Sequence, residues 1–334
     1  MSAIRLFSPD QGPLPTPPAR IRTVFDALAF YRALLKSRLE AGEYKAKTIA
    51  NYERYLRRLE KDLGPMEVAD LRQFHFTTWL NANADRWGVR SRQDAQNTIL
   101  TCFRRLEDEE VLDRSPFRRP RFKYVAPIKP PFNREHYVAL MRAARDRRQP
   151  KYRRGSRALR RAIYFLWKTG ARPGEMRNLK WSQIDWVNGT VHLREHKTAH
   201  ITGDDRIIGL PSRLLGLLAA MKRRASSTYV FLDNYGQPWS GTSEEDNERG
   251  KNSFCRLYKR WARRAGLPEK VTAHSLRHGF CVRAIEQGVP GRAIADQQGW
   301  KSERMVSHYG RGSRSNDQHI QGVAEAVDRG RKKK

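Results

Sequence analysis

The chain has 334 residues, 39% of them hydrophobic and 10% aromatic, enough to bury one large core or two ordinary ones, which excludes disorder as the default. Its 66 lysines and arginines outnumber 35 acidic residues and give a formal net charge of +31. No run of about 18 apolar residues is present, so an ordinary transmembrane helix is not expected.

The positive charge indicates a class of partner. Arginine accounts for 48 of the basic residues, and its planar guanidinium binds phosphate through paired hydrogen bonds. An anionic membrane surface or a solvated basic face would also be rich in basic residues. Here, however, these residues are spread along the whole chain rather than gathered in one amphipathic helix or tail. We therefore expect nucleic acid, and no membrane, as the partner.

The cysteines and the first residues bear on the compartment. Cys102, Cys255 and Cys281 lie far apart, match no zinc spacing and are typical of a reduced cytoplasmic protein. Residues 1–20 lack the apolar core of a signal peptide and are predicted to be a flexible N-terminus. With nucleic acid as the partner, the expected location is the cytoplasm, in association with the nucleoid.

Residues 21–113 are predicted to form a helical domain. The first segment, "TVFDALAFYRALLKSRLEAG", has apolar residues at helical spacing and ends at a glycine. We expect its core stripe to contain Phe25, Leu28, Ala29 and Leu35. The next, "KTIANYERYLRRLEKDLG", has a longer apolar stripe, made of Ile49, Tyr52, Leu56, Leu59 and Leu63. These stripes predict a core, with the arginines between them facing outward.

Residues 114–132 are predicted to be a basic, proline-rich linker. The stretch "RSPFRRPRFKYVAPIKPPFNR" holds five prolines and seven basic residues without an acidic one. Proline disfavours both a helix and a central strand, so the stretch is expected to be extended. Such a linker is suited to lie along a phosphate backbone; a plain basic spacer is the alternative.

Residues 133–328 are predicted to form a second domain, followed by a basic tail over 329–334. Two helical segments come first, and then the apolar period changes to alternation over "IDWVNGTVHLREHKTAHITGDDRIIGLP", with a turn at Asn188-Gly189. That pattern predicts about three antiparallel strands. Helical spacing returns from about Ser212. The predicted fold class is therefore mainly α with a small antiparallel β-sheet.

Several residues of this domain are candidates for chemistry, although each alone has a plainer interpretation. "TGARPGE" places Arg172 between two helices with Glu175 behind it, yet one arginine is most often a solvated charge. "AHSLRHGF" places His274 and Arg277 on one helix face, although a structural role for His274 fits as well. Lys197 in "REHKTAH" falls at a hairpin turn, where a lysine normally faces solvent.

The order of these residues is more specific than any one of them. Arginine and glutamate, a hairpin lysine, an H-x-x-R-H helix, Gly-Trp at Trp300 and finally Tyr309 in "SHYGR" follow one another. This series resembles the tyrosine recombinase (phage integrase) family, and the resemblance covers nearly the whole chain. It implies a two-domain, C-shaped clamp in which a helical, SAM-like core-binding domain precedes an α+β catalytic domain of the DNA breaking-rejoining type.

The resemblance also implies roles for these residues. Arg172 and Arg277 would bind the non-bridging oxygens of the scissile phosphate, and Lys197 would be the general acid toward the leaving 5′ oxygen. His274 would assist proton transfer, and Tyr309 would be the nucleophile rather than a core ring. Trp300 stands where most members have a second histidine and resembles Cre recombinase there; an indole N–H donates a hydrogen bond but cannot act as acid or base.

Glu175 and His278 would support the same site. No carboxylate cluster has metal-ligand spacing, and the resemblance implies neither a cofactor nor a metal. It implies double-stranded DNA as the substrate and a homo-tetramer on two duplexes, closed by the C-terminal segment with its Ile320, Val323, Ala324 and Val327 stripe. A directionality factor is a further possible partner. The function implied is site-specific recombination or integration, with a type IB topoisomerase-like enzyme or a non-catalytic DNA-binding protein as alternatives.

Overall fold

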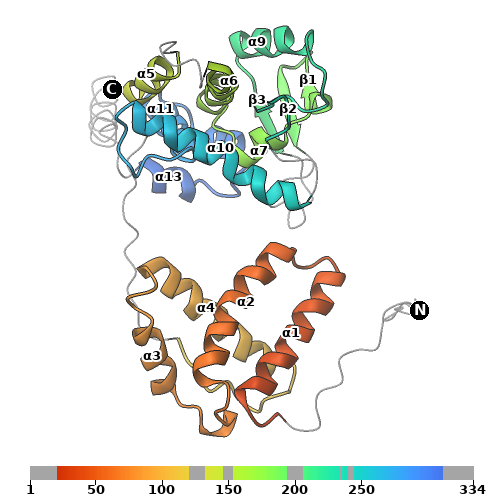
Figure 1. Ribbon diagram of the computed structural model, residues 1–334, viewed down its shortest axis with the longest axis vertical. Helices are drawn as coiled ribbons and strands as arrows, with labels where there is room; N and C mark the ends of the chain where they lie inside the picture. The colour runs from red at the N-terminus through yellow and green to blue at the C-terminus, as the bar shows by residue number, and fades with distance from the viewer. Residues whose placement is uncertain are drawn as a thin grey trace, which may run out of the picture. The chain divides into compact units, whose positions relative to one another are not determined.

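The computed structural model describes residues 21–119, 132–145, 153–193, 206–233, 235–239 and 244–310. For residues 153–156, 244–253 and 308–310 the backbone alone is described. The chain divides into two compact units, Met1–Pro127 and Ile128–Lys334, coloured red to yellow and yellow-green to blue in Figure 1. Each unit has its own hydrophobic core.

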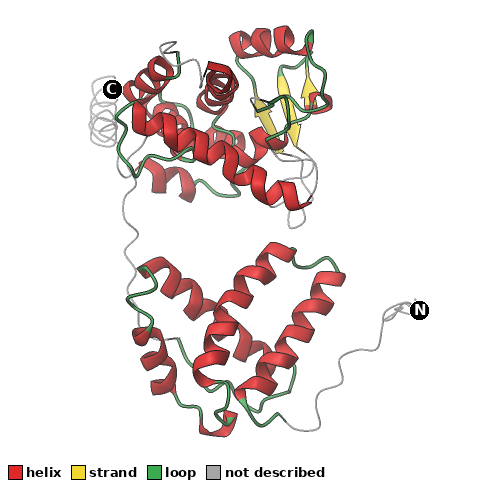
Figure 2. Ribbon diagram, viewed as in Figure 1, coloured by secondary structure: helices red, strands yellow, loops and turns green. Residues whose placement is uncertain are grey.

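The N-terminal unit is helical in its described part (Figure 2). Its elements are α1 (Val24–Glu40), α2 (Ala46–Leu63), a short 3-10 helix η1 (Val68–Asp70), α3 (Gln73–Ala82) and α4 (Val89–Asp108). Helices α1, α2 and α4 pack on one another, and α3 packs on α4. The predicted stripe of α2 is confirmed, because Leu56 and Leu59 are fully buried and the other members are half-buried in the same core.

The predicted core face of α1 is partly wrong. Thr23 caps the helix through a capping box with Asp26, and the buried series then begins at Val24. Leu28 and Leu35 belong to that series, but the side chain of Phe25 is 44% exposed and Ala29 is exposed as well. The buried positions of α1 are Val24, Ala27, Leu28, Phe30, Tyr31 and Leu35. Phe25 and Ala29 lie outside this face because successive residues are rotated by about 100° around a helix.

Both ends of the predicted linker belong to the cores. Phe117 is buried in the N-terminal unit, where its ring stacks on Phe76 at 4.8 Å between ring centroids. Phe132 is fully buried in the C-terminal unit. Residues 120–131, which contain the central part of the proline-rich stretch, lie outside the described residues.

The C-terminal unit is mainly helical with a small sheet, as predicted. Its helices are α5 (Arg134–Ala143), α6 (Arg153–Thr169), α7 (Pro173–Asn178), the 3-10 helix η3 (Trp181–Gln183), α9 (Ser212–Lys222), α10 (Glu244–Arg264), α11 (Ser275–Glu286), α12 (Gly291–Gln298) and α13 (Arg304–Gly310). The sheet lies at one end of the unit and α5 at the other (Figure 1). Helix α11 packs along α6, and α13 packs on α11 and α12.

The sheet has the antiparallel order β1-β2-β3, with β1 at Ile184–Asp185, β2 at Thr190–Leu193 and β3 at Arg206–Gly209. Val191 pairs with Ile208, and Leu193 pairs with Arg206. Since alternate strand residues share a face, all four of these side chains point to the same side, and all are buried. An arginine therefore occupies a core position of β3.

The close contact between α11 and the start of the unit depends on a glycine. A β-carbon built on Gly279 would lie 1.8 Å from the carbonyl oxygen of Phe132, so no other residue fits without moving the backbone. This contact sets the depth at which α11 lies beside α6.

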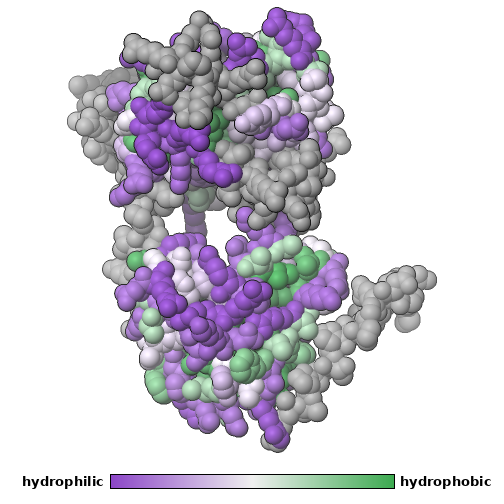
Figure 3. Space-filling model, in the orientation of Figure 1, coloured by the Kyte–Doolittle hydropathy of each residue, from purple (hydrophilic) through white to green (hydrophobic). Residues whose placement is uncertain are grey.

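The surface is largely polar. On the face shown in Figure 3, hydrophilic residues cover most of the described surface of both units. Among the described residues, no helix combines the length and the apolar character needed to cross a bilayer.

Candidate active site

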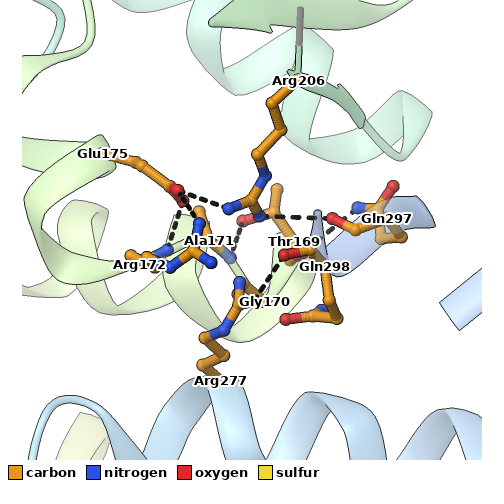
Figure 4. Close-up of polar contacts among 9 residues, drawn as sticks. All are labelled: Thr169, Gly170, Ala171, Arg172, Glu175, Arg206, Arg277, Gln297 and Gln298. Atoms are coloured by element: carbon orange, nitrogen blue, oxygen red, sulfur yellow. Dashed lines mark hydrogen bonds and ion pairs between the residues drawn. The ribbon is translucent and has the colours of Figure 1, made fainter. Parts of the chain in front are cut away.

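The turn that joins α6 to α7, residues 169–172, is the centre of a polar network drawn in Figure 4. The turn is inside the unit: Thr169 and Ala171 are buried, and the Thr169 hydroxyl donates to the carbonyl of Phe165 at 2.8 Å. Arg172 follows as the N-cap residue of α7, with Pro173 in the first helical position, as the sequence predicts.

Glu175 fixes Arg172 at this helix start. The backbone N–H of Arg172 donates to Oε2 of Glu175 at 2.6 Å, and its Nη1 donates to Oε1 at 2.6 Å. The first bond satisfies a backbone N–H at the helix start, and the second is an ion pair that fixes the guanidinium. The side chain of Arg172 remains 24% exposed, whereas that of Glu175 is 10% exposed. A guanidinium held in this way is oriented before any ligand arrives.

Arg277 reaches the same turn from α11. Its side chain is fully buried, Nη1 donates to the carbonyl of Gly170 at 3.0 Å, and Nη2 donates to the carbonyl of Gln298. Its guanidinium carbon lies 5.0 Å from the centre of the Trp300 ring, a cation–π contact. Arg277 therefore connects the Arg172 turn to the end of α12.

The two histidines near Arg277 differ in their positions. His274 is the N-cap residue of α11 rather than a residue within the helix, and it is exposed, whereas His278 is half-buried one turn further on. His274 therefore lies at the boundary of the helix, and its carbonyl accepts from the backbone N–H of Arg277 at 3.2 Å. The two residues differ in burial, since Arg277 is buried.

Arg206 is a member of the network that the sequence did not predict. It begins β3, its side chain is 2% exposed, and its Nη1 donates to Oε1 of Glu175, the oxygen that Arg172 also binds. Nη2 of Arg206 donates to the carbonyl of Gln297 at 3.3 Å. The pKa of Arg206 is lowered to about 10. Burial is the main cause, Arg172 lowers the pKa as well, and Glu175 opposes both by raising it. The group therefore stays charged at neutral pH.

A signal for Arg206 does exist in the sequence. In "RIIG" the alternation of the strand puts Arg206 on the same face as Ile208 and opposite to Ile207. Both isoleucines are apolar, so the sequence does not say which faces the core. The structure buries Ile208 and leaves Ile207 49% exposed, and Arg206 follows Ile208 inward.

The end of α12 is held against the turn by Gln297. Its side-chain Oε1 accepts from the backbone N–H of Gly209 at 2.9 Å, and its Nε2 donates to the carbonyl of Thr169 at 3.1 Å. The helix ends at Gly299, which has a φ of 62° and is followed by half-buried Trp300. The Gly-Trp pair is thus a helix C-cap followed by the ring that contacts Arg277.

Two predicted residues lie where the side chain is not described. Lys197 belongs to residues 194–205, which connect the paired strands β2 and β3 and lie outside the described residues. Tyr309 is in α13, of which the backbone at this position is described and the side chain is not. Helix α13 packs on α11 and α12 of the same chain, and Val306 is buried between them.

The centre of the site contains more positive than negative groups. Arg172 and Arg206 share the single carboxylate of Glu175, and Arg277 is bound to the carbonyls of the same turn and of α12. A network with three guanidiniums and one carboxylate keeps an excess of positive charge, which favours an anion such as phosphate as the ligand.

Comparison with known sequences agrees with this chemistry. A sequence profile described as the phage integrase family matches residues 132–316, more than half of the chain. The chain belongs to the phage integrase family. The matched region begins at Phe132 and contains the turn at 169–172, the end of α12 and Tyr309.

Two relatives within the phage integrase family show the extent of the similarity. The tyrosine recombinase XerA of Pyrococcus furiosus is 30% identical over 169 residues, which cover 50% of this chain and 52% of that protein. A XerC-like tyrosine recombinase of Caldanaerobacter subterraneus subsp. tengcongensis is 23% identical over 283 residues, covering 76% of this chain and 71% of that protein. The match to XerA thus spans about half of that recombinase's length.

Solved structures of integrases share the fold. A lambda integrase dimer bound to a COC' core site gives a TM-score of 0.68 with 21% identity, over 87% of this chain and 78% of that one. The Tn1549 transposon integrase in complex with transposon right end DNA gives a TM-score of 0.69 with 17% identity, over 91% and 99%. The predicted fold class is confirmed by these similarities and by the described helices and sheet.

Proposed function

We propose that this member of the phage integrase family is a site-specific DNA recombinase that cleaves and rejoins duplex DNA through a 3′-phosphotyrosyl intermediate. One observation carries the proposal. Arg172, Arg277 and Trp300 come from three separate segments and meet at the turn 169–172, and the helix that bears Tyr309 packs on two of those segments. This arrangement suits an anionic phosphodiester attacked by a phenol.

In the cleavage step, the phenolic oxygen of Tyr309 attacks the phosphorus of one DNA phosphodiester. The new bond is a 3′-phosphotyrosyl ester, and the bond from phosphorus to the 5′ oxygen breaks. Lys197 donates a proton to that 5′ oxygen, while His274 assists removal of the proton from the phenol. A free tyrosine has a pKa of about 10, so it reacts only when it is held in place and deprotonated there.

The guanidiniums of Arg172 and Arg277 stabilise the negative charge that grows on the non-bridging oxygens during attack. Such donors act more strongly on the transition state than on the ground state when they are fixed beforehand. Glu175 fixes Arg172, and His278 supports the cleft from α11. Trp300 donates its indole N–H to the phosphate and takes no part in proton transfer.

In the rejoining step, the 5′-hydroxyl of a partner duplex attacks the phosphotyrosyl ester and releases Tyr309. Each step exchanges one phosphoester for another, so ATP is not consumed. The paired guanidiniums supply the positive charge at phosphorus, so the reaction is proposed to need no metal ion. Activity in EDTA equal to activity in magnesium would support this, and loss in EDTA would contradict it.

The substrate of the proposed enzyme is double-stranded DNA, bound by a core-binding domain over residues 21–113 and a catalytic domain over 133–328, with the basic linker 114–132 following the backbone. Exchange of four strands requires four active protomers, which favours a homo-tetramer on two duplexes. Support comes from the lambda integrase, whose structure is a tetramer bound to a Holliday junction. The C-terminal segment around residues 320–327, outside the described residues, is proposed to join neighbouring protomers. A protein with this substrate acts at the nucleoid.

A covalent-capture experiment tests the proposal. Chromosomal DNA that flanks the gene is fragmented, nicked at random and incubated with the protein, and fragments that stay attached in denaturant are sequenced. The preferred site is then made as a duplex nicked on the 5′-hydroxyl side of the scissile phosphate, so that the leaving fragment diffuses away. The wild-type protein should accumulate a covalent complex, and Tyr309→Phe should form none.

The same assay separates the alternatives. A non-catalytic DNA-binding protein would retain DNA without a covalent bond. A type IB topoisomerase-like enzyme would relax supercoiled plasmids that lack the captured site, as a monomer. Covalent capture at one preferred sequence, with strand exchange between two duplexes that carry it, would support the recombinase and contradict both.

A further inference from the structure

Arg206 occupies an unusual position for a charged residue. Its side chain is 2% exposed on the core face of β3, opposite buried Leu193. Burying a cation is unfavourable unless hydrogen bonds and an opposite charge compensate for the lost water. The question is therefore which groups it holds, and what they do.

The groups that Arg206 holds come from two distant segments. Nη1 binds the Glu175 carboxylate, 31 residues away, and Nη2 binds the carbonyl of Gln297, 91 residues away. Oε1 of Glu175 thus accepts from Arg206 and from Arg172 together. Arg206 is the only described side chain in Figure 4 that contacts both the carboxylate behind Arg172 and the end of α12.

The stem of Arg206 also packs on the turn before Trp300. A β-carbon built on Gly299 would lie 2.7 Å from Cδ and 2.9 Å from Nε of Arg206. Glycine is therefore favoured at position 299 for two reasons: it adopts a φ of 62°, and it leaves room for the arginine stem. The backbone that leads into Trp300 therefore lies against the Arg206 side chain.

The rest of β3 is fixed to the same elements. At the other end of the strand, Gly209 donates its N–H to the side chain of Gln297, which in turn binds the carbonyl of Thr169. Residues 194–205, the connection that contains Lys197, join the strand directly at Arg206. A displacement of Arg206 would therefore shift three parts together: the Arg172 turn, the Trp300 segment and the end of the connection that joins β3.

We propose that Arg206 is a positioning residue for strand cleavage: its buried guanidinium holds the Glu175 carboxylate that orients Arg172 and fixes the end of α12 from which Trp300 extends. The inference rests on the proposed recombinase function. Arg206 does not touch the DNA in this role; it acts through Arg172 and through the Gly299–Trp300 turn.

Replacing Arg206 by lysine tests the positioning role separately from the positive charge. Arg206→Lys keeps the positive charge, but a single ammonium group does not reproduce the planar fork that binds Glu175 and Gln297 in different directions. The single-turnover rate of covalent complex formation should fall about 10- to 100-fold, because displacements on the order of 1 Å have effects of that size. DNA affinity should change by less than about threefold, since the buried group contributes no phosphate contact of its own.

A purely structural arginine would also slow the enzyme, so the readout must involve Arg172. The substrate is made with a methylphosphonate at the scissile position, which removes the negative charge that Arg172 serves. If Arg206 acts through Arg172, the rate loss of Arg206→Lys should shrink to about threefold or less on this substrate, as the charge to be stabilised is gone. An equal loss on both substrates would contradict the inference.

Arg283→Lys is the matched control. Arg283 is a half-buried arginine of the same unit that donates to the carbonyl of Trp167 at 2.6 Å and stacks over that ring, away from Glu175. Its rate on the two substrates should change in the same proportion. Circular dichroism and thermal unfolding verify folding, and Arg206→Gln, which removes the buried charge, replaces the lysine variant if that one does not fold.

The outcomes are distinguishable. If the wild-type protein forms no covalent complex at all, the proposed function fails and the inference fails with it. If the wild-type protein reacts and Arg206→Lys reacts equally fast, the function stands and the positioning role is wrong. A substrate-dependent loss that Arg283→Lys does not share supports both.

Discussion

Each unit of the molecule contains a network of arginine and glutamate, and the two networks differ in their charge balance. In the N-terminal unit, Arg32 of α1 binds Glu53 at 3.0 Å and Glu60 at 2.6 Å, both on α2. Glu53 also binds Arg57 at 2.8 Å, so two cations meet two anions, and the side chains of Arg32, Glu53 and Glu60 are 22–29% exposed. The hydrogen bond with Glu60 raises the pKa of Arg32 and lowers that of Glu60.

In the C-terminal unit, two cations share one anion. Arg172 and Arg206 both bind Glu175, Arg206 is almost fully buried, and burial lowers the pKa of Arg206 by more than Glu175 raises it. The first network is neutralised by its own residues and joins two helices. The second retains positive charge at a partly exposed guanidinium, which is what an anionic ligand requires. The same residue types thus join two helices in one unit and, in the proposed function, would recognise an anionic ligand in the other.

The largest expected effect comes from truncating the exposed cation of the second network. Arg172→Ala should slow covalent complex formation by about 1,000-fold, because it removes a preorganised donor to the charge of the transition state. DNA affinity should stay within about threefold, since the chain has 66 lysines and arginines and the others are expected to supply most of the phosphate contacts. Rates come from single-turnover cleavage of the nicked duplex, and affinity from fluorescence anisotropy.

Arg32→Ala is the control from the first network. It should leave the cleavage rate unchanged within about twofold. Equal losses of binding and cleavage in Arg172→Ala would make that arginine an affinity group, and the contrast between the two networks would disappear.

A second test concerns the leaving oxygen rather than the phosphate charge. Lys197→Ala should slow cleavage about 100-fold, within the range usual for loss of a general acid. A substrate with sulfur at the bridging 5′ position needs no proton to leave, so the variant should cleave it at nearly the wild-type rate. A variant that stays slow on the sulfur substrate would reject the acid role of Lys197.

A third test compares buried amides. In the N-terminal unit, Asn83 donates to the carbonyl of Trp79 and accepts from Arg58. In the C-terminal unit, the fully buried side chain of Gln298 has no hydrogen-bond partner among the described residues. Gln298→Met keeps the length and removes the unpaired groups. It should stabilise its unit by about 1–2 kcal/mol, a rise of about 2–4 °C in the midpoint.

Asn83→Leu is the opposite case, because it removes both hydrogen bonds of a buried amide, although Arg58 keeps Asp62 as an acceptor at 2.9 Å. It should destabilise the N-terminal unit by about 1–3 kcal/mol. Calorimetry of the full chain measures both transitions. A decrease in stability with Gln298→Met would show that the amide is paired in solution.

The smallest effect concerns pH. The pKa of Glu60 is lower in the folded protein than in the unfolded chain, so its stabilising contribution is present above the unfolded value of about 4.3 and disappears as the pH falls through the folded value. Arg32→Leu should therefore reduce the stability of the α1–α2 pair by about 0.5–1 kcal/mol at pH 7, a modest amount for a partly exposed pair. The difference should shrink as the pH falls below the unfolded value and vanish once the pH is below the folded pKa of Glu60.

Hydrogen-exchange mass spectrometry of α1 and α2 in the two proteins measures this difference at each pH. A difference that stays unchanged as the pH is lowered until Glu60 is protonated would mean that Arg32 stabilises the helices through packing of its stem rather than through Glu60.

Local patterns in the sequence predicted much of the site. The Arg172–Glu175 pair, three residues apart with Pro173 between them, forms a helix start that nearby residues make recognisable in the sequence. The paired strands around the Lys197 connection and the glycine before Trp300 are local in the same sense. The core face of α1 was misjudged at Phe25 because two overlapping apolar series fit one helix, and only contact with α2 and α4 selects between them.

By itself, the sequence determined the helical class, the small antiparallel sheet and the order of the candidate catalytic residues, since periodicity, turn chemistry and motif order are properties of neighbouring residues. Only the tertiary structure decided that Arg206 faces inward, that Arg277 is buried against the Arg172 turn, and that α13 packs on its own unit. The physical reason is distance along the chain. The bonds of Arg206 span 31 and 91 residues, and which of two apolar neighbours in a strand faces the core depends on what covers it.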